Sequence, residues 1–175
     1  MFIPTIYIEN IKPENKSIEV SSNKLHHLKN VLRIRDEDKI NISNGKGLVF
    51  YGNFVNNCVK INKSRMYERQ NSLRIFVPYL REKNRFRFLI EKLTELNVNE
   101  VHIGMTENTQ NTNYNKSKIL DWAISALEQS GSAYLPSLFF PDNLNFSVFS
   151  TCLDISGEKL NKNREKLNNF AVGPE

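Results

Sequence analysis

A run of basic and imidazole side chains, HHLKNVLRIR from His26 to Arg35, is the densest group of chemically active residues in the first part of the chain. Its cationic groups could hold phosphates, with Arg33 and Arg35 making paired contacts to phosphate oxygens. His26 or His27 could stack on a nucleic-acid base. Basic residues in the last turn of a helix also favour its dipole without any ligand, so a structural interpretation stays open.

A helix is expected to carry this run, because apolar residues recur there at helical spacing and two serines before them can cap its start. Its predicted apolar face consists of Leu25, Leu28, Val31 and Leu32, and the helix is predicted to end near Leu32. The side chains of His26, Lys29 and Arg33 are predicted to share one face beside these apolar residues.

Short strands surround this helix in the first 64 residues. Alternating or β-rich patterns predict strands at residues 2–8, 18–20, 39–43, 48–55 and 58–61. Asn44-Gly45 is a hairpin turn sequence, and Asn56-Asn57 can serve in the same way, because asparagine and glycine tolerate positive φ. The first part of the chain is therefore predicted to be a small β-barrel-like module with a single helix.

The pattern changes after residue 72 to alternating strands and helices. Strands are predicted at residues 73–77, 101–105, 138–140, 151–155 and 170–172, and helices at 86–96 and 119–127. Asn97 and Gly131 would end the two helices. This alternation predicts an α/β fold with a parallel sheet, whose ligands bind beyond the carboxyl ends of the strands. A polar stretch at residues 64–72 divides the chain into residues 1–68 and 73–175.

Positive charge is concentrated in one part of the sequence. The chain has 24 lysines and arginines against 19 aspartates and glutamates, a net charge of +5. The window from Lys60 to Lys92, which includes Arg85 and Arg87, holds ten basic residues and three acidic ones. A one-sided basic field suits a polyanion such as RNA, DNA or an acidic membrane surface. Many basic runs are solvated surface and nothing more, so charge alone leaves both interpretations open.

Several other classes of protein do not fit the composition. No apolar run approaches the length of a membrane span, and the N-terminus lacks the pattern of a secretion signal, so we expect a soluble protein of the cytoplasm. Cys58 and Cys152 form no CxxC pair, and three histidines cannot build a histidine-rich site. A disulfide framework and a structural metal are therefore not expected.

Four motifs follow one another over nearly the whole chain. The first is HHLKNVLRIRDEDKINISNGKG, and the second is FRFLIEKLTELNVNEVHIGMTENTQ. The third is ALEQSGSAYLP, and the fourth is AVGPE. In this order they resemble the motifs of the ribosomal RNA small subunit methyltransferase E family, and AVGPE resembles the start of that family's Gly-rich loop. The common order makes the resemblance far more specific than any single motif.

The resemblance implies a PUA-like RNA-binding β-barrel over residues 1–68 and a SPOUT methyltransferase domain with a trefoil knot over residues 73–175. It further implies a homodimer that uses S-adenosylmethionine to methylate N3 of one uridine in the 16S ribosomal RNA of the small subunit. Because the N3–H of uridine is weakly acidic, such an enzyme must remove its proton or favour the anion, and must hold the methyl group in line with N3.

The resemblance also carries roles onto single residues. The candidate catalytic residues are Glu107 and Gln129, and the cofactor-binding candidates are Val172, Gly173, Pro174 and Glu175. The RNA-binding candidates are His26, His27, Lys29, Arg33, Arg35, Arg85 and Arg87. The sequence departs from the family at Asn97, where glycine is usual, and at Asn108 and Ser132, where arginine is frequent.

The chain ends at Glu175, inside the motif that resembles the Gly-rich loop. We therefore expect a SPOUT domain that is truncated before the knot is completed. Two interpretations follow: the chain is part of an active methyltransferase, or it is a non-catalytic RNA-binding remnant without the methyl-donor site. The nucleotides after the codon for Glu175 would separate them. We also expect an incompletely covered sheet around Phe170–Val172, with an exposed apolar edge.

Overall fold

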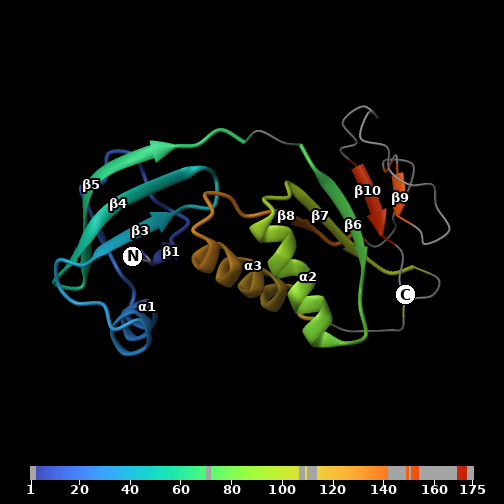
Figure 1. Ribbon diagram of the computed structural model, residues 1–175, viewed down its shortest axis with the longest axis horizontal. Coiled ribbons are helices and arrows are strands. Elements are labelled where there is room, and N and C mark those ends of the chain that lie inside the picture. The colour runs from blue at the N-terminus through green and yellow to red at the C-terminus, as the bar shows by residue number, and fades with distance from the viewer. Residues whose placement is uncertain are drawn as a thin grey trace. The chain divides into compact units, whose positions relative to one another are not determined.

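The computed structural model describes residues 3–69, 72–106, 109, 114–141, 149, 151–153 and 169–172 of the chain (Figure 1). They belong to two compact units. The first unit comprises Met1–Arg69 together with Ile124–Leu135, and the second comprises Gln70–Ala123 and Pro136–Glu175. A segment far along the sequence is therefore part of the first unit.

The first unit is built on a mixed five-stranded sheet that curls into a half-barrel (Figure 1). Its strands are β1 (Thr5–Tyr7), β2 (Ser17–Glu19), β3 (Lys39–Ser43), β4 (Leu48–Val55) and β5 (Cys58–Met66). The order is β1-β3-β4-β5-β2, with β1 parallel to β3 and the other neighbours antiparallel. The predicted positions of the strands are confirmed, and β5 runs five residues beyond its predicted end at Ile61.

Turns connect the central strands at both predicted positions. Asn56 and Asn57 have φ values of 50° and 67°, the paired left-handed conformation that joins β4 to β5. Gly45 has a φ of 68° in the turn between β3 and β4. The core on the inner face of the sheet includes Leu28, Ile40, Ile42, Phe50, Phe54 and Val59, all with 1% exposure or less.

The helix of the first unit differs from its prediction in its C-terminal half. It begins as α1 (Ser22–His26) and continues as a π-helical turn, η1 (His27–Val31), in which the Leu32 amide donates to the His27 carbonyl. A π-turn holds one more residue than an α-turn, so it rotates the residues that follow it away from the predicted face. Leu28 is fully buried, but Val31 and Leu32 are 61% and 41% exposed, so their assignment to the apolar face was wrong.

Arg33 lies beyond the end of this helix. Its φ of 55° is left-handed, and the preceding Leu32 is the C-terminal cap of η1. The prediction that His26, Lys29 and Arg33 share one helical face was therefore wrong for Arg33. The left-handed residue turns the chain sharply before it enters β3.

The second unit contains a parallel sheet, as predicted. Its elements are β6 (Arg74–Pro78), α2 (Lys83–Glu95), β7 (Glu100–Gly104), α3 (Lys116–Ser130), β8 (Ser137–Phe139), β9 (Thr151–Leu153) and β10 (Asn169–Val172). The strand order is β8-β7-β6-β10-β9, and every neighbouring pair is parallel. The α/β fold class is confirmed. Helix α3 crosses the division between the units, since its residues from Ile124 onward belong to the first.

Strand β10 lies inside this sheet and not at its edge. Phe170 pairs with Ile75 of β6 on one side and with Thr151 of β9 on the other, and Ala171 is buried. The expectation of an exposed apolar edge at Phe170–Val172 was therefore wrong. A parallel sheet places its strands in an order that does not follow the sequence, so a strand late in the chain can be inserted between earlier ones.

Aromatic side chains pack between α2 and the N-terminal half of α3. Phe86 is fully buried, and its ring centroid lies 5.7 Å from that of Tyr79, 4.9 Å from that of Tyr114 and 6.1 Å from that of Trp122.

Neither α2 nor α3, nor any other helix in the described ranges, has the length and apolar character that a membrane span requires.

Asn97 ends α2 in the left-handed conformation, with a φ of 60°. The Asn97 amide donates to the Thr94 carbonyl and the Val98 amide to the Leu93 carbonyl, which is the hydrogen-bond pattern of a Schellman cap. Within the described residues, the side-chain oxygen of Asn97 is buried without a hydrogen-bond partner. The position thus favours a residue that tolerates positive φ, and the amide side chain adds an unsatisfied acceptor.

We predict that Asn97→Gly stabilises the protein by about 0.5 kcal/mol, because glycine adopts positive φ without strain and removes the unsatisfied oxygen. Asn97→Ala is expected to destabilise it by about 1 kcal/mol, because a non-glycine side chain without local hydrogen bonding is strained in this conformation. Urea denaturation followed by circular dichroism measures both. An alanine variant as stable as the glycine variant would contradict the assignment of the cap.

Candidate functional site

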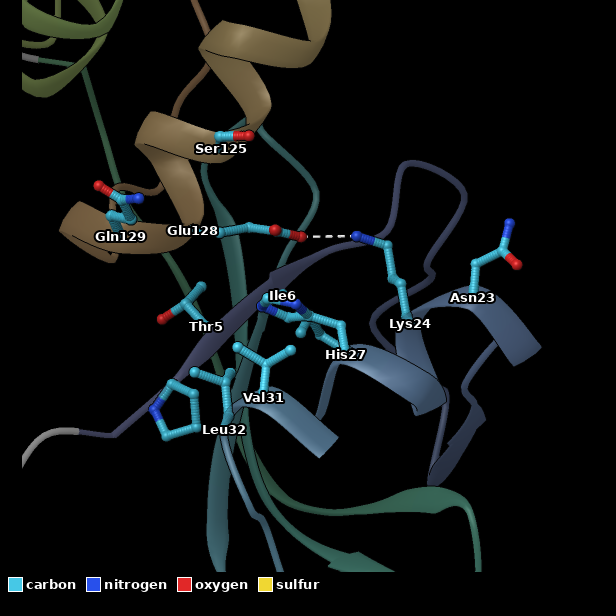
Figure 2. A pocket seen from close by; sticks show the side chains of 11 residues that line it. Thr5, Ile6, Asn23, Lys24, His27, Val31, Leu32, Ser125, Glu128 and Gln129 are labelled. Carbon is cyan, nitrogen blue, oxygen red and sulfur yellow. Dashed lines mark hydrogen bonds and ion pairs between the residues drawn. The ribbon is translucent and has the colours of Figure 1, made fainter. Parts of the chain in front are cut away.

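The C-terminal half of α3 and the N-terminal elements of the first unit line an open pocket of about 550 Å³. Three segments line it: Pro4, Thr5 and Ile6 at β1; Asn23, Lys24, His27, Val31 and Leu32 from α1 to the end of η1; and Ser125, Glu128 and Gln129 on α3. The three α3 residues lie at positions i, i+3 and i+4, so they face the same side of the helix. Figure 2 shows the side chains that surround the pocket.

The carboxylate of Glu128 connects all three segments. Its Oε1 accepts a hydrogen bond of 2.8 Å from the backbone amide of Tyr7 and one of 2.5 Å from Nζ of Lys24. Lys24 and Glu128 point toward each other from α1 and α3 (Figure 2). Their side chains are 31% and 24% exposed, so the ion pair is partly shielded from water.

The pocket combines an apolar wall with a few polar groups. Pro4, Ile6 and Leu32 supply apolar surface, whereas His27 and Gln129 supply an imidazole and a carboxamide. Such a site can accept a flat ring that carries both donors and acceptors, because apolar side chains cover its faces and a carboxamide can pair with its edge. Beside the pocket, burial and the Glu9 carboxylate raise the pKa of Tyr7, which keeps its phenol uncharged.

The basic run that the sequence singled out lies on the surface of the same unit. His26 and Lys29 are exposed; Asn30 Nδ2 lies 2.9 Å from His26 Nδ1, and Lys29 Nζ donates to Asn57 Oδ1 at 2.6 Å. Arg33 and Arg35 are exposed as well, and in the part of the chain that the structure describes neither guanidinium makes a hydrogen bond or ion pair. These two charges are therefore available to an external anion.

Arg85 and Arg87 belong to α2 in the second unit, and each has an acidic partner, on the helix or at its N-terminal cap. Nε of Arg85 lies 3.0 Å from Glu82, and Nε of Arg87 lies 2.6 Å from Glu91. Both arginines remain at least half exposed. Their charge is thus partly compensated, in contrast with that of Arg33 and Arg35.

The candidate catalytic and cofactor residues are only partly described by the structure. Gln129 lies in the pocket of the first unit, whereas Glu107 lies outside the described residues. Val172 is half-buried at the carboxyl end of β10, between β6 and β9 in the sheet order. Gly173, Pro174 and Glu175 lie outside the described residues. The described ranges contain no group of three or more His, Cys, Asp or Glu side chains placed to hold a metal ion.

Sequence reasoning missed Glu128 and Lys24, the pair that organises the pocket. They are 104 residues apart, and neither stands out by local pattern. The only signal was the position of Glu128 next to Gln129 in the ALEQSG motif, where a carboxylate follows two buried residues, Ala126 and Leu127. An acidic residue at the border of a buried helix face often has a partner, but the sequence does not say which.

Comparisons with known proteins agree with this architecture. The chain matches the RNA methyltransferase domain family over residues 68–175 and the RNA methyltransferase PUA domain over residues 21–51. The fold and these matches define the class: a two-unit protein with an RNA methyltransferase domain. The chain belongs to the RNA methyltransferase domain family, and the curated relatives described next carry the name ribosomal RNA small subunit methyltransferase E.

Two relatives with that name come from strains of Buchnera aphidicola. The protein from the Schizaphis graminum subspecies is 31% identical over 153 residues, which cover 80% of this chain and 62% of the relative. The protein from the Acyrthosiphon pisum subspecies is 30% identical over 162 residues, which cover 86% of this chain and 62% of the relative. The matched part thus spans less than two thirds of the length of these relatives.

A solved structure has the same fold. It is a ribosomal RNA small subunit methyltransferase E from Neisseria gonorrhoeae bound to S-adenosyl methionine, with a TM-score of 0.80 and 19% sequence identity. The superposition covers 99% of this chain and 80% of that one.

We predict that Glu128→Ala destabilises the first unit by about 1–2 kcal/mol, because it removes a charged acceptor from both Tyr7 N–H and Lys24. Glu128→Gln should cost less, since an amide oxygen can still accept from Tyr7. Lys24→Ala should cost under about 1 kcal/mol, the usual range for a partly exposed ion pair. Urea denaturation measures all three. Equal losses for the alanine and glutamine variants at Glu128 would show that the Tyr7 hydrogen bond contributes nothing.

Proposed function

We propose that this protein methylates N3 of a specific uridine in 16S ribosomal RNA, with S-adenosylmethionine as the methyl donor, and that it works as a homodimer in the cytoplasm. The observation that carries the proposal is the match of residues 68–175 to the RNA methyltransferase domain. The name of the Buchnera relatives supports a small-subunit ribosomal RNA as substrate. The donor bound in the Neisseria structure supports S-adenosylmethionine.

The methyl-donor site is proposed at the carboxyl ends of the parallel strands in the second unit. Pro78 and Gly104 are register partners at the ends of β6 and β7, and Val172 ends the neighbouring β10. Two points support this edge: ligands of a parallel sheet bind beyond the carboxyl ends of its strands, and the half-buried Val172 supplies an apolar side chain there. Gly173 and Glu175 would complete it with backbone amides, and Pro174 with its apolar ring. When bound there, S-adenosylmethionine would supply an activated methyl group.

Removal of the N3 proton is the chemical task left to the protein's own side chains. Glu107 is the proposed general base, since a carboxylate can accept that proton. Gln129 is the proposed partner of one uracil carbonyl, because its carboxamide NH2 can donate to that oxygen and leave N3 open to the base and to the methyl group. Its place in a partly apolar pocket supports this role.

The RNA would be held through its phosphates by the basic run on the first unit. Arg33 and Arg35 are exposed, and neither guanidinium makes an ion pair with a described residue. His26, His27 and Lys29 are the further candidates on α1 and η1, and Arg85 and Arg87 are those on α2. Phosphate contacts of this kind position an RNA strand without reading its sequence.

The proposed function is tested with the protein in the full length that its gene encodes. We expect S-adenosylmethionine to bind in isothermal titration calorimetry, and N3-methyluridine to appear in 16S ribosomal RNA by mass spectrometry after incubation with small ribosomal subunits. Gln129→Ala should lower kcat while donor affinity is kept. RNA binding without donor binding would instead support the non-catalytic RNA-binding alternative. Donor binding with methylation at another atom would contradict the N3 assignment.

The proposed phosphate contacts give a separate prediction. Arg33→Ala and Arg35→Ala should each weaken binding to a 16S ribosomal RNA fragment, and each should reduce the slope of log K against log salt concentration by about 0.7, the value for one contact to single-stranded RNA. Lys12→Ala is the control, because Lys12 is an exposed cation of the same unit outside the run. An unchanged salt slope in both arginine variants would remove these residues from the RNA contacts.

A further inference from the structure

Three tyrosines in the first unit each have a cationic side chain over the ring. Lys63 Nζ lies 5.0 Å from the ring centroid of Tyr51, and the guanidinium carbon of Arg65 lies 4.6 Å from that of Tyr67. The guanidinium carbon of Arg69 lies 4.6 Å from the ring centroid of Tyr134. We call these six residues the tyrosine strip. None of them is among the residues assigned above to the pocket or to the basic run.

Hydrogen bonds join the three tyrosines into one continuous feature. The hydroxyls of Tyr51 and Tyr67 lie 2.5 Å apart, and the Tyr134 hydroxyl donates to the backbone carbonyl of Tyr67 at 2.5 Å. Lys63 is the register partner of Tyr51 across β4 and β5. Lys63, Arg65 and Tyr67 follow one another at every second residue, so they lie on one face of the extended chain. Tyr51, Lys63, Arg65 and Tyr67 therefore form a row on one face of the paired strands β4 and β5, extended by the hydrogen bond from Tyr134.

The two cations of β5 in this row, Lys63 and Arg65, lie in a long stretch of sequence without carboxylates, which ends before Glu68. No aspartate or glutamate occurs between residues 39 and 67. Lys63 and Arg65 are exposed, and neither makes an ion pair with another described residue. The paired strands β4 and β5 thus present positive charge and aromatic rings together, which is the composition of a surface for single-stranded nucleic acid.

The Tyr51 hydroxyl is suited to stay uncharged beside an anion. Burial and the hydrogen bond with Tyr67 raise the pKa of Tyr51 to about 12. A phenolate would repel a phosphate, whereas a neutral phenol does not. Because the hydroxyls bond to each other and to the backbone, the orientation of the rings is fixed before any ligand binds.

We propose that the tyrosine strip binds single-stranded RNA, with bases stacking on the tyrosine rings and phosphates contacting Lys63 and Arg65. On binding, each long cationic side chain exchanges its contact with a ring for a contact with a phosphate. Two residues of a strand span about 6.6 Å, a spacing that an extended RNA strand can follow from one phosphate to the next. The proposal rests on the proposed function in one respect, the choice of RNA as the polyanion.

Fluorescence anisotropy with a labelled twelve-nucleotide oligouridylate and the full-length protein tests the proposal. Tyr51→Leu keeps apolar bulk but removes the aromatic face, so affinity should fall about ten-fold, within the range for the loss of one stacked base. Tyr51→Phe keeps the ring, so its affinity should stay within about two-fold of the wild type. Equal affinities of the leucine and phenylalanine variants would overturn the stacking role.

The charges are tested separately with Lys63→Gln combined with Arg65→Gln, two exposed substitutions that leave the core intact. The slope of log K against log salt concentration should fall by about 1.4, twice the value for one phosphate contact to a single strand. Lys12→Gln combined with Lys16→Gln removes the same charge elsewhere on the unit and should leave the slope unchanged. Equal effects of the two pairs would overturn the strip as a specific site.

Two further results keep the strip distinct from the enzyme function. If the wild type binds oligouridylate and methylates ribosomal RNA while all strip variants bind like the wild type, the strip proposal fails and the proposed function stands. If the wild type binds neither oligouridylate nor a 16S ribosomal RNA fragment, both fail. Polyglutamate of matched charge should compete poorly, because it has no bases to stack. Competition as strong as that of unlabelled oligouridylate would reassign the strip to acidic peptides.

Discussion

The carboxylate of Glu128 is the contact on which the pocket of the first unit depends. Strand β1 has three residues, and among the described strands it pairs with β3 alone, so its outward amide at Tyr7 has no partner in the described part of the sheet. Helix α1 has five residues and no side-chain hydrogen bond at its cap, and a helix of that length is marginal on its own. Glu128 bonds to both elements from the much longer α3. The longer helix α3 thereby holds the short strand β1 and the short helix α1 in place.

Local signals were sufficient to predict the elements and the class of the fold. The turns at Asn56-Asn57 and Gly45 and the helix ends at Asn97 and Gly131 all have the positive φ that their residue types favour. A positive φ is a property of one or two residues, so a single sequence reveals it. The alternation of strands and helices likewise predicted the parallel sheet, because parallel neighbours require crossover helices.

Features that depend on contacts between distant segments could not be predicted from the sequence. The π-turn at η1 moves Val31 and Leu32 out of the core although their spacing is that of a regular helix. Similarly, β10 pairs between β6 and β9, and nothing in its own residues distinguishes an inner strand from an edge strand. The ion pair of Glu128 with Lys24 joins two residues whose local sequence gives no signal of a partner. Each case depends on which segments meet in space, and periodicity carries no such information.

The basic window from Lys60 to Lys92 shows why a count of charges is a poor guide to a binding surface. Three cations of α2 have a carboxylate partner: Arg85 with Glu82, Arg87 with Glu91, and Lys92 with Glu95. On β5 the cations lie instead over tyrosine rings. A carboxylate cancels a positive charge, whereas a ring only attracts it and leaves the net charge in place. The same density of lysine and arginine therefore produces a compensated helix surface and an uncompensated strand surface, and only the second retains its full attraction for a polyanion.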